Sequence, residues 1–352
     1  MAYKLIYIED LDPSSIMHEL KNIGFEVIHH NPETFENSIS EILGGQFDAI
    51  LIDFRLTSGK AIFDAPTIAQ TLRTRNSKNH AFIPIILVSS EDIISDYYKD
   101  FSSHDLFDFV LSKSQLLKNP GTFRVRAISF IDSYKYITEQ KFLIDSILNI
   151  QDRIRESLDF RIVELLNKYA NQNDNFGYSR FIYKELIKCP GALIPKNILQ
   201  ARLGIMSTSP DWDNLKVLLK DVEYTGIFSD AYELWWSSGL DLWWNEQVKD
   251  AGGLRRYTAE QRVEKLKKAT QFENLLAIPK SKFSKSTNFW TVCVATGQPI
   301  DPIDGFELYK KNLYPWQDKQ YLSMEAALDA VPLFEYLKPI EKARFKDMVK
   351  TM

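Results

Sequence analysis

The sequence predicts an N-terminal α/β domain with a parallel sheet, a long helical connector and a mainly helical C-terminal domain. Over the first 118 residues, apolar strand-like runs alternate with amphipathic helix-like segments. Between Thr122 and Asn171 there is no Pro or Gly, and apolar residues recur at helical spacing. After residue 172, turn signals separate further helix-like segments. The expected domain bounds are therefore 1–120, 121–171 and 172–352.

Five short apolar runs predict the strands: Lys4–Ile8, Glu26–Ile28, Ala49–Ile52, Ile83–Val88 and Phe107–Leu111. The first helix is expected to begin at Asp12-Pro13, because Asp is a good N-cap and Pro suits the first helical position. Gly24 should end it. Three more helices are expected near Phe35–Leu43, Pro66–Leu72 and Ile93–Phe101. Strand–helix alternation of this kind predicts a doubly wound parallel sheet.

The connector is expected to be one long helix or a helical hairpin with a break near Thr138–Lys141. Fifty helical residues would extend about 75 Å. A helix of that length needs a partner along its apolar face. Two partners stay open: the C-terminal part of the same chain, or a second copy that forms a homodimer through residues 122–171.

Composition is that of a soluble globular protein, with 45% apolar and 26% charged residues. No apolar run reaches the length of a membrane span, and the N-terminal apolar stretch is too short for a signal peptide. Cys189 and Cys293 have no metal or redox spacing. We therefore expect a cytoplasmic protein without a membrane partner.

Charge and histidine content divide the chain. Residues 1–118 carry a net charge of −7, whereas the remainder carries +3. All five histidines precede residue 105. This distribution argues against histidine-based catalysis or a histidine-ligated metal in the C-terminal domain.

Polar residues stand at the ends of four predicted strands. Glu9 and Asp10 follow the first strand, Asp53 the third and Ser89 the fourth, and Lys113 follows the last apolar run. Because a parallel sheet gathers the carboxyl ends of its strands at one edge, these side chains should converge there. Three acids, a hydroxyl and a lysine are the groups needed to place a phosphoryl group on an aspartate.

Phosphoryl transfer to a carboxylate must overcome the repulsion between two anions. A Mg²⁺ ion does this by bridging them, and it prefers carboxylate oxygens and water as ligands. Asp10 and Asp53 are the expected ligands, with Glu9 alongside and the backbone carbonyl of Arg55 as a further one. The cofactor expected from the sequence is therefore Mg²⁺.

Asp53 is the expected phosphoacceptor, and an aspartyl phosphate is the product. Lys113 should pair with the phosphoryl oxygens as a point charge. Ser89 should donate a hydrogen bond to one of these oxygens once the phosphoryl group is present. Each residue alone would be interpreted as an ordinary polar residue at the end of a strand. The five together, in this order, favour the interpretation as a phosphoacceptor site.

The order of these residues resembles the receiver domain of two-component response regulators. The flanking sequences agree, at residues 48–56 around Asp53 and 84–90 before the hydroxyl. The resemblance covers about residues 1–135 and implies a flavodoxin-like sheet of order 2-1-3-4-5. It also implies a histidine kinase or phosphotransfer protein as phosphodonor and a surface at the fourth helix and fifth strand that reorganises.

The sequence departs from the family pattern at three places. Ser114 stands where a proline usually follows the lysine. Phe109 lies one position early relative to Lys113, which puts Val110 at the switch position, so Ser89, Phe109 and Val110 are the switch candidates. The stretch between the acceptor and the hydroxyl is also longer than usual, with its extra residues expected at Thr57–Ala65 and Asn76–Ala81.

The C-terminal domain contains all seven tryptophans. Trp235, Trp236, Trp243 and Trp244 form two pairs eight residues apart, which on one helix would make a broad aromatic side. A buried core helix is the favoured interpretation. A partner-binding groove or a base-stacking platform is the alternative.

A second candidate surface is basic. Residues 251–286 hold nine Lys and Arg against three Glu, including Arg255, Arg256, Lys267 and Lys268. Such a patch would meet nucleic acid or an acidic protein, although a solvated helix face is the commoner explanation. No helix-turn-helix, zinc finger or phosphate loop is present. Asp301 and Asp304 are expected to stabilise a turn rather than bind a metal.

The leading hypothesis is a response regulator that is phosphorylated on Asp53 and signals through a protein-binding C-terminal domain. A phosphate sink or relay intermediate for a kinase is the second hypothesis, because no effector is recognisable; receivers with unfamiliar partners occur in bacterial defence operons, and a place in such an operon rests on analogy alone. Phosphorylation-controlled nucleic-acid binding is the third. An unrecognised enzyme in the C-terminal domain ranks last, because no catalytic constellation is readable there.

Overall fold

The computed structural model describes residues 2–74, 83–90, 105–249 and 252–351. The chain forms two compact units. The N-terminal unit comprises Met1–Ile147, Val163–Tyr183 and Gly226–Ala231. The C-terminal unit comprises Leu148–Ile162, Lys184–Thr225 and Tyr232–Met352. The units therefore interleave along the sequence, whereas three successive segments were expected.

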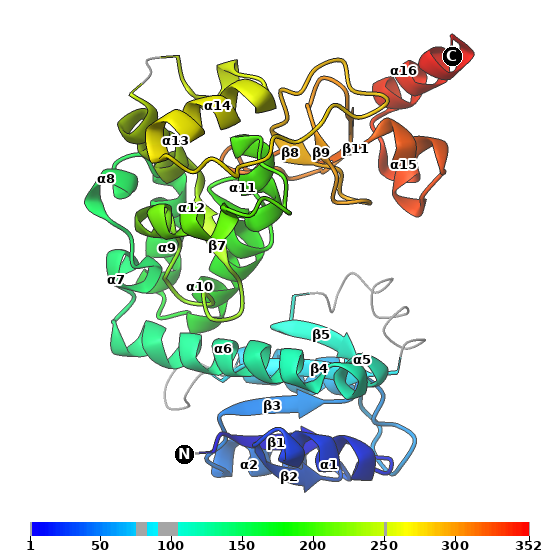
Figure 1. The fold of residues 1–352 in the computed structure, drawn as a ribbon. Coiled ribbons are helices and arrows are strands. Elements are labelled where there is room, and N and C mark those ends of the chain that lie inside the picture. The colour runs from blue at the N-terminus through cyan, green and yellow to red at the C-terminus, as the bar shows by residue number, and fades with distance from the viewer. Residues whose placement is uncertain (1, 75–82, 91–104, 250–251, 352) are drawn as a thin grey trace. The chain divides into compact units, whose positions relative to one another are not determined.

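The N-terminal unit is built on a parallel sheet of five strands in the order β2-β1-β3-β4-β5 (Figure 1). This confirms the expected sheet and its strand order. The strands begin and end within two residues of the expected bounds: β1 Lys4–Ile8, β2 Glu26–His30, β3 Ala49–Ile52, β4 Ile85–Ser89 and β5 Phe109–Ser112.

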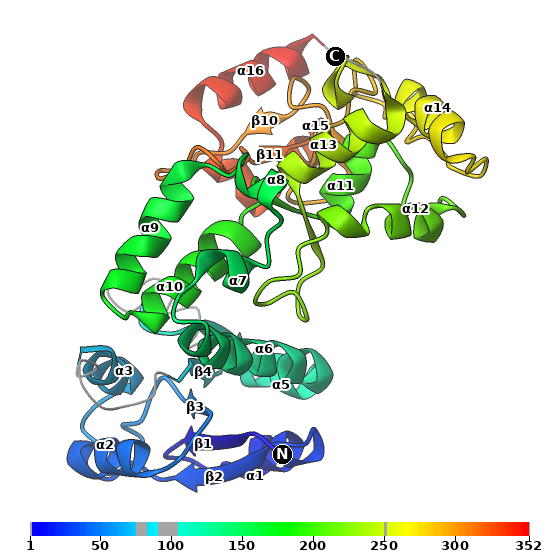
Figure 2. The ribbon, with the colours of Figure 1, turned by 90° about the vertical axis from the view of Figure 1, so that its left-hand side faces the viewer.

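Helices cover both faces of this sheet. Figure 2 shows α2 (Phe35–Gly44) and α3 (Ala65–Thr74) on one face, and α1 (Ser14–Asn22), α5 (Lys113–Lys118) and α6 (Pro120–Glu139) on the other. Every residue of β3 and β4 is buried, as expected for strands covered on both sides. The helix expected near Ile93–Phe101 lies outside the described residues.

The first helix begins one residue later than expected. Pro13 is its N-cap and makes no side-chain capping bond, while the Asp12 carboxylate accepts the Ser14 N–H at 3.0 Å. The helix ends at Asn22, and Gly24 follows with φ of +90°, a conformation that disfavours residues with a Cβ.

The connector is not one continuous helix. It forms four helices: α6, α7 (Ile144–Leu148), α8 (Asp152–Arg155) and α9 (Phe160–Asn171). Lys141 and Phe142, with φ of 49° and 60°, stop α6 close to the break expected at Thr138–Lys141. Positive φ at two successive non-glycine residues cannot continue a right-handed helix.

The apolar face of α6 has a partner within the N-terminal unit. It packs against α10 (Asn175–Phe181). The Phe130 ring meets the rings of Tyr183 and Phe228, each at a centroid distance of 4.8 Å. Packing within the chain thus accounts for this face, and a homodimer through residues 122–171 stays a prediction.

The C-terminal unit is mainly helical, as expected. A π-helical stretch, Ile182–Ile187, leads into it, and it has three 3-10 helices: Lys220–Val222, Leu254–Arg256 and Pro332–Tyr336. Its α-helices are α8, α11 (Lys196–Leu203), α12 (Trp212–Leu218), α13 (Ser237–Val248), α14 (Ala259–Thr270), α15 (Met324–Leu328) and α16 (Pro339–Lys350). Among the described residues, no helix is both long and apolar enough to cross a bilayer.

Three two-stranded antiparallel sheets join these helices. They pair β6 (Leu193–Pro195) with β7 (Leu234–Trp236), β8 (Thr291–Val292) with β9 (Pro299–Ile300), and β10 (Phe306–Glu307) with β11 (Tyr321–Leu322). A buried cluster around Phe306, Leu322 and Met324 forms a second core beneath the last pair.

The tryptophan pairs lie on two elements and not on one helix. Trp235 and Trp236 belong to β7, whereas Trp243 and Trp244 belong to α13. All four side chains are at most 3% exposed. The four residues therefore do not form one aromatic side of a single helix, and their burial supports the favoured interpretation as core residues over the alternative of a partner surface.

Candidate functional site

Asp53 lies directly after β3 at the carboxyl edge of the sheet and is 6% exposed. Its Oδ1 accepts hydrogen bonds from the Ser89 hydroxyl and from the Phe54 N–H, the latter at 2.7 Å. Its Oδ2 accepts from the Lys113 ammonium at 2.7 Å. The structure thus brings the expected acceptor, hydroxyl and lysine into direct contact.

Lys113 bridges two carboxylates. Its Nζ lies 2.5 Å from Oε2 of Glu9 and 2.7 Å from Oδ2 of Asp53. Burial lowers the lysine pKa, but the hydrogen bonds and charges of the two acids outweigh burial and raise the pKa above its ordinary value. Lys113 is therefore a permanent cation at this edge.

A capping box positions the lysine. β5 runs into α5, of which Lys113 is the first residue. The Ser112 hydroxyl accepts the Gln115 N–H, and the Gln115 side chain accepts the Ser112 N–H, both at 3.1 Å. Ser114 continues this helix, and the described backbone contains no cis peptide bond.

Glu9 is 1% exposed and fully hydrogen-bonded. Its Oε2 also accepts from the Tyr7 hydroxyl at 2.7 Å, and its Oε1 accepts from the Leu11 N–H at 3.3 Å. Burial first, then the Glu9 charge, raises the pKa of Tyr7, so this hydroxyl remains a donor. Sequence reasoning missed Tyr7; the available signal was a tyrosine within an otherwise aliphatic strand, two residues before the acid.

Asp10 differs from the other two acids because one of its oxygens has no partner. Its Oδ2 accepts from the Gly59 N–H at 2.7 Å, whereas Oδ1 is buried without a hydrogen bond in the described structure. Gly59 lies in the expected extra stretch Thr57–Ala65, so this loop closes over the acid. The other expected stretch, Asn76–Ala81, lies outside the described residues.

The charge balance and the donor set suit a divalent cation. Glu9, Asp10 and Asp53 bring three carboxylates, and Lys113 offsets only one. The unpartnered Asp10 oxygen is the kind of ligand that Mg²⁺ prefers. No three acid, histidine or cysteine side chains among the described residues already surround a common point. The Arg55 guanidinium lies 3.3 Å from Asp64. That the backbone carbonyl of Arg55 is a metal ligand stays a prediction.

The switch candidates lie on opposite faces of the sheet. Val110 packs on the α2–α3 face, which Ser89 shares by strand alternation and register. Phe109 points to the α6 face, where its ring lies 5.1 Å from Phe130 and 3.9 Å from the Arg126 guanidinium. Ser89 and Phe109 therefore do not form a hydroxyl–aromatic pair on one face.

The basic candidates in the C-terminal unit are surface residues without a readable site. Arg255 and Arg256 are exposed, and Lys268 pairs with Glu264 within α14 at 2.6 Å. Lys267 lies in the last turn of the same helix. Because the four tryptophans are buried, their rings are not available for the alternative interpretation, a base-stacking platform.

The aspartates of the proline-rich loop make turn contacts. Asp301 accepts from the Ile303 N–H at 3.1 Å and from the Ser286 hydroxyl at 3.2 Å. Asp304 accepts from the Lys285 N–H at 2.9 Å. These bonds are those of a structured turn.

No protein-family model and no curated protein matches the sequence. A receiver domain from Methylobacillus flagellatus is similar in structure at 18% identity and a TM-score of 0.26, over 32% of this chain and 87% of its own. The receiver domain of a Pseudomonas aeruginosa sensor histidine kinase was solved with magnesium in its active-site cleft. It is similar in structure at 18% identity and a TM-score of 0.27, over 34% of this chain and 93% of its own. A Vibrio cholerae chemotaxis response regulator is similar at 16% identity and a TM-score of 0.28, over 34% of this chain and 98% of its own.

Proposed function

We propose that this chain is a response regulator whose phosphoacceptor is Asp53. The observation that carries the proposal is the position of the Lys113 ammonium, 2.7 Å from Asp53 and 2.5 Å from Glu9, beside an Asp10 oxygen without a partner. A cation, an acceptor and a vacant oxygen ligand at one sheet edge serve phosphoryl transfer better than they serve stability. The proposed donor is a histidine kinase or phosphotransfer protein.

The chain's own residues would act in a defined order. An Asp53 carboxylate oxygen forms the new bond to phosphorus, while the bond between phosphorus and the donor imidazole breaks. Lys113 keeps its charge and turns from the carboxylates to the phosphoryl oxygens. The Ser89 hydroxyl, now on Oδ1 of Asp53, becomes free to donate to a phosphoryl oxygen. A bound Mg²⁺, held by Asp10 and Asp53 with Glu9 alongside, would offset the charge of the incoming phosphoryl group.

The proposed output is binding of a protein partner by the C-terminal unit. The Lys113–Ser89 rearrangement would alter β5 and α5, and α6 follows directly in the chain. Because α6 packs on α10, a shift in the sheet would first reach this helix within the same unit. A cytoplasmic location, expected from the sequence, belongs to this proposal.

Incubation of the full chain with Mg²⁺ and a small phosphodonor should give one base-labile phosphoryl group, read by intact mass. Asp53→Asn should abolish it. The matched control is Asp12→Asn, because Asp12 is an exposed aspartate whose carboxylate bonds only Ser14 in the described structure. Modification that persists in Asp53→Asn, or that is lost in Asp12→Asn, would contradict the assignment.

Asp10→Asn should stabilise the metal-free protein and remove its response to Mg²⁺. The substitution removes one of three neighbouring carboxylate charges, of which Lys113 offsets only one, yet keeps an oxygen for the Gly59 N–H, so we expect a gain of about 1 kcal/mol in unfolding free energy. Wild-type protein should gain about 2.7 kcal/mol when Mg²⁺ is present at a hundred times its dissociation constant.

Thermal melting with and without Mg²⁺ measures both effects of Asp10→Asn. Na⁺ at equal ionic strength serves as the salt-matched comparison. An Asp10→Asn variant that still gains stability from Mg²⁺ would show that Asp10 is not a ligand.

A phosphate sink is the second candidate, favoured by Val110 at the switch position and by Phe109 on the other face. A sink needs the acceptor site but no relay to an output. Its kinase should phosphorylate a competing receiver faster when this chain carries Asp53→Ala. An unchanged rate would contradict the phosphate-sink proposal, and the response-regulator proposal would be the one that remains.

A further inference from the structure

Tyr7 is a buried tyrosine in β1, between two isoleucines. Ile6 and Ile8 belong to the apolar cluster beneath α2 and α3, so strand alternation turns the Tyr7 side chain to the opposite face of the sheet. Helix α5, which begins with Lys113, covers that face (Figure 2). The tyrosine therefore lies on the side of the sheet from which the lysine reaches the phosphoacceptor site.

The Tyr7 hydroxyl has a single acceptor among the described residues. It donates to Oε2 of Glu9 at 2.7 Å. Burial first, then the charge of Glu9, raises the pKa of Tyr7, so the hydroxyl keeps its proton and remains a donor at neutral pH. A phenylalanine would fill the same space in the strand and would need no acceptor. The hydroxyl therefore serves Glu9 and not the packing of the sheet.

The same Glu9 oxygen accepts from a second donor, the Lys113 ammonium, at 2.5 Å. The other oxygen, Oε1, accepts from the Leu11 N–H at 3.3 Å. Glu9 is 1% exposed, so solvent has little access to replace a donor that leaves. The two donors on Oε2 therefore determine how well this buried charge is satisfied.

The proposed phosphorylation removes one of these two donors. When Lys113 turns to the phosphoryl oxygens, Oε2 of Glu9 loses its cationic partner. With tyrosine at position 7, this oxygen keeps a hydroxyl donor. With phenylalanine it would keep none, and a buried acceptor without a partner is costly. The hydroxyl therefore makes the departure of the lysine less unfavourable.

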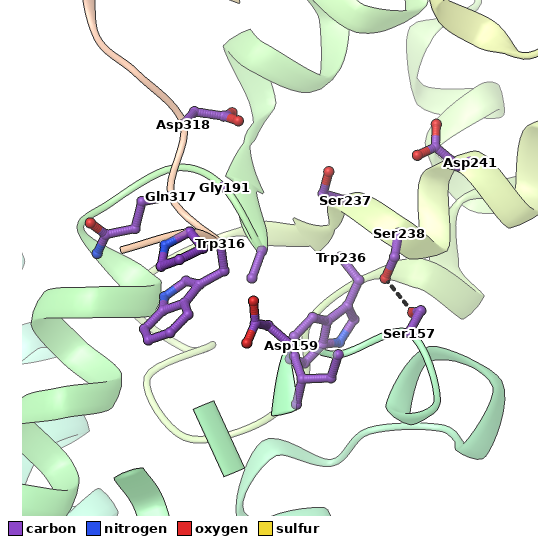
Figure 3. A pocket seen from close by; sticks show the side chains of 13 residues that line it. Ser157, Asp159, Gly191, Trp236, Ser237, Ser238, Asp241, Trp316, Gln317 and Asp318 are labelled. Carbon is purple, nitrogen blue, oxygen red and sulfur yellow. Dashed lines mark hydrogen bonds between the residues drawn. The ribbon is translucent and has the colours of Figure 1, made fainter. Parts of the chain in front are cut away.

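Two acids of the C-terminal unit show the contrasting case. Figure 3 shows Asp159 and Asp318 in the lining of a pocket. They pair with Arg161 at 2.6 Å and with Arg202 at 2.5 Å. No step of the proposed reaction takes either arginine away. Glu9 differs because its cation has a second destination, the phosphoryl group, and this difference gives a permanent second donor its use.

We propose that Tyr7 is a positioning residue of the phosphoacceptor site, a permanent donor that holds the Glu9 carboxylate while Lys113 moves to the phosphoryl group. This role rests on the proposed phosphorylation of Asp53 and adds a residue that the expected site did not include. Tyr7 touches neither the phosphodonor nor the phosphoryl group. It acts through Glu9 on the freedom of the lysine.

Tyr7→Phe should slow phosphorylation of the full chain about tenfold to a hundredfold, the usual effect of leaving a buried acceptor without its partner. Initial rates with acetyl phosphate and Mg²⁺, read by intact mass below the melting temperature of each variant, measure the effect. Tyr134→Phe is the matched control. It removes another buried tyrosine hydroxyl from a buried carboxylate, that of Asp108 at 2.6 Å, and should react at the wild-type rate while folded.

A double-mutant cycle with Lys113→Met separates positioning from a merely structural role. Because this variant has no lysine to release, Tyr7→Phe should slow its phosphorylation no further. Slowing by the same factor in both backgrounds, or a wild-type rate for Tyr7→Phe alone, would overturn the role of Tyr7 and leave the phosphorylation of Asp53 standing. A wild-type chain that accepts no phosphoryl group on Asp53 would contradict the proposed function, and the role of Tyr7 with it.

Discussion

Asp108→Ala is expected to lower the unfolding free energy of the N-terminal unit by about 3–5 kcal/mol, the usual cost of breaking a buried ion pair. The Asp108 carboxylate is fully buried. It accepts from the Arg73 guanidinium at 2.8 Å, from the Tyr134 hydroxyl at 2.6 Å and from the Ile85 N–H at 2.7 Å. The alanine variant would leave two buried donors without an acceptor and the buried Arg73 guanidinium without its countercharge, although Arg73 keeps its hydrogen bond to the Leu106 carbonyl.

Urea denaturation monitored by hydrogen exchange in β4 and α6 measures this loss. Asp132→Ala is the matched control, because it removes an exposed aspartate–tyrosine hydrogen bond, from Tyr3, and should cost less than about 1 kcal/mol. Equal destabilisation by the two substitutions would show that the buried network adds nothing beyond a surface contact. The Asp108 network joins α3, β4 and α6. We expect its loss to slow phosphorylation only by the fraction of the protein that is unfolded.

The receiver-like sheet was predictable because its signals are local. Each strand is an apolar run, and strand ends in a parallel sheet meet at one edge, so Glu9, Asp53, Ser89 and Lys113 could be brought together from their order alone. Their contacts agree with that expectation: Lys113 reaches both acids, and Ser89 reaches Asp53.

The remaining features depend on contacts between distant residues. Trp235 and Trp236 form a strand only because they pair with Ile194 and Leu193, some forty residues earlier. The break at Lys141 and Phe142 was expected, whereas the further breaks that separate α7, α8 and α9, including Asn149 with φ of 43°, were not. Tyr7 and Asp108 are single polar residues in apolar surroundings, and their partners follow from packing.

Lys113→Met is expected to slow phosphorylation of Asp53 by about 10²–10³-fold, the usual effect of removing one preorganised charge-stabilising group. Methionine matches the length of the lysine stem but carries no charge. Initial rates with a small phosphodonor and Mg²⁺ measure the effect. Lys118→Met changes an exposed lysine of the same helix and should react at the wild-type rate.

The same substitution separates catalysis from structure. Without the ammonium, Glu9 and Asp53 become two uncompensated buried carboxylates beside Asp10, so the metal-free variant should be less stable than wild type. Mg²⁺ would then supply the missing charge, and its stabilising effect should be larger in Lys113→Met than in wild type. Because added Mg²⁺ restores the fold but not the phosphoryl contact, phosphorylation should remain slow in the stabilised variant. Full recovery of the rate by Mg²⁺ would mean that Lys113 serves only to hold the acids together.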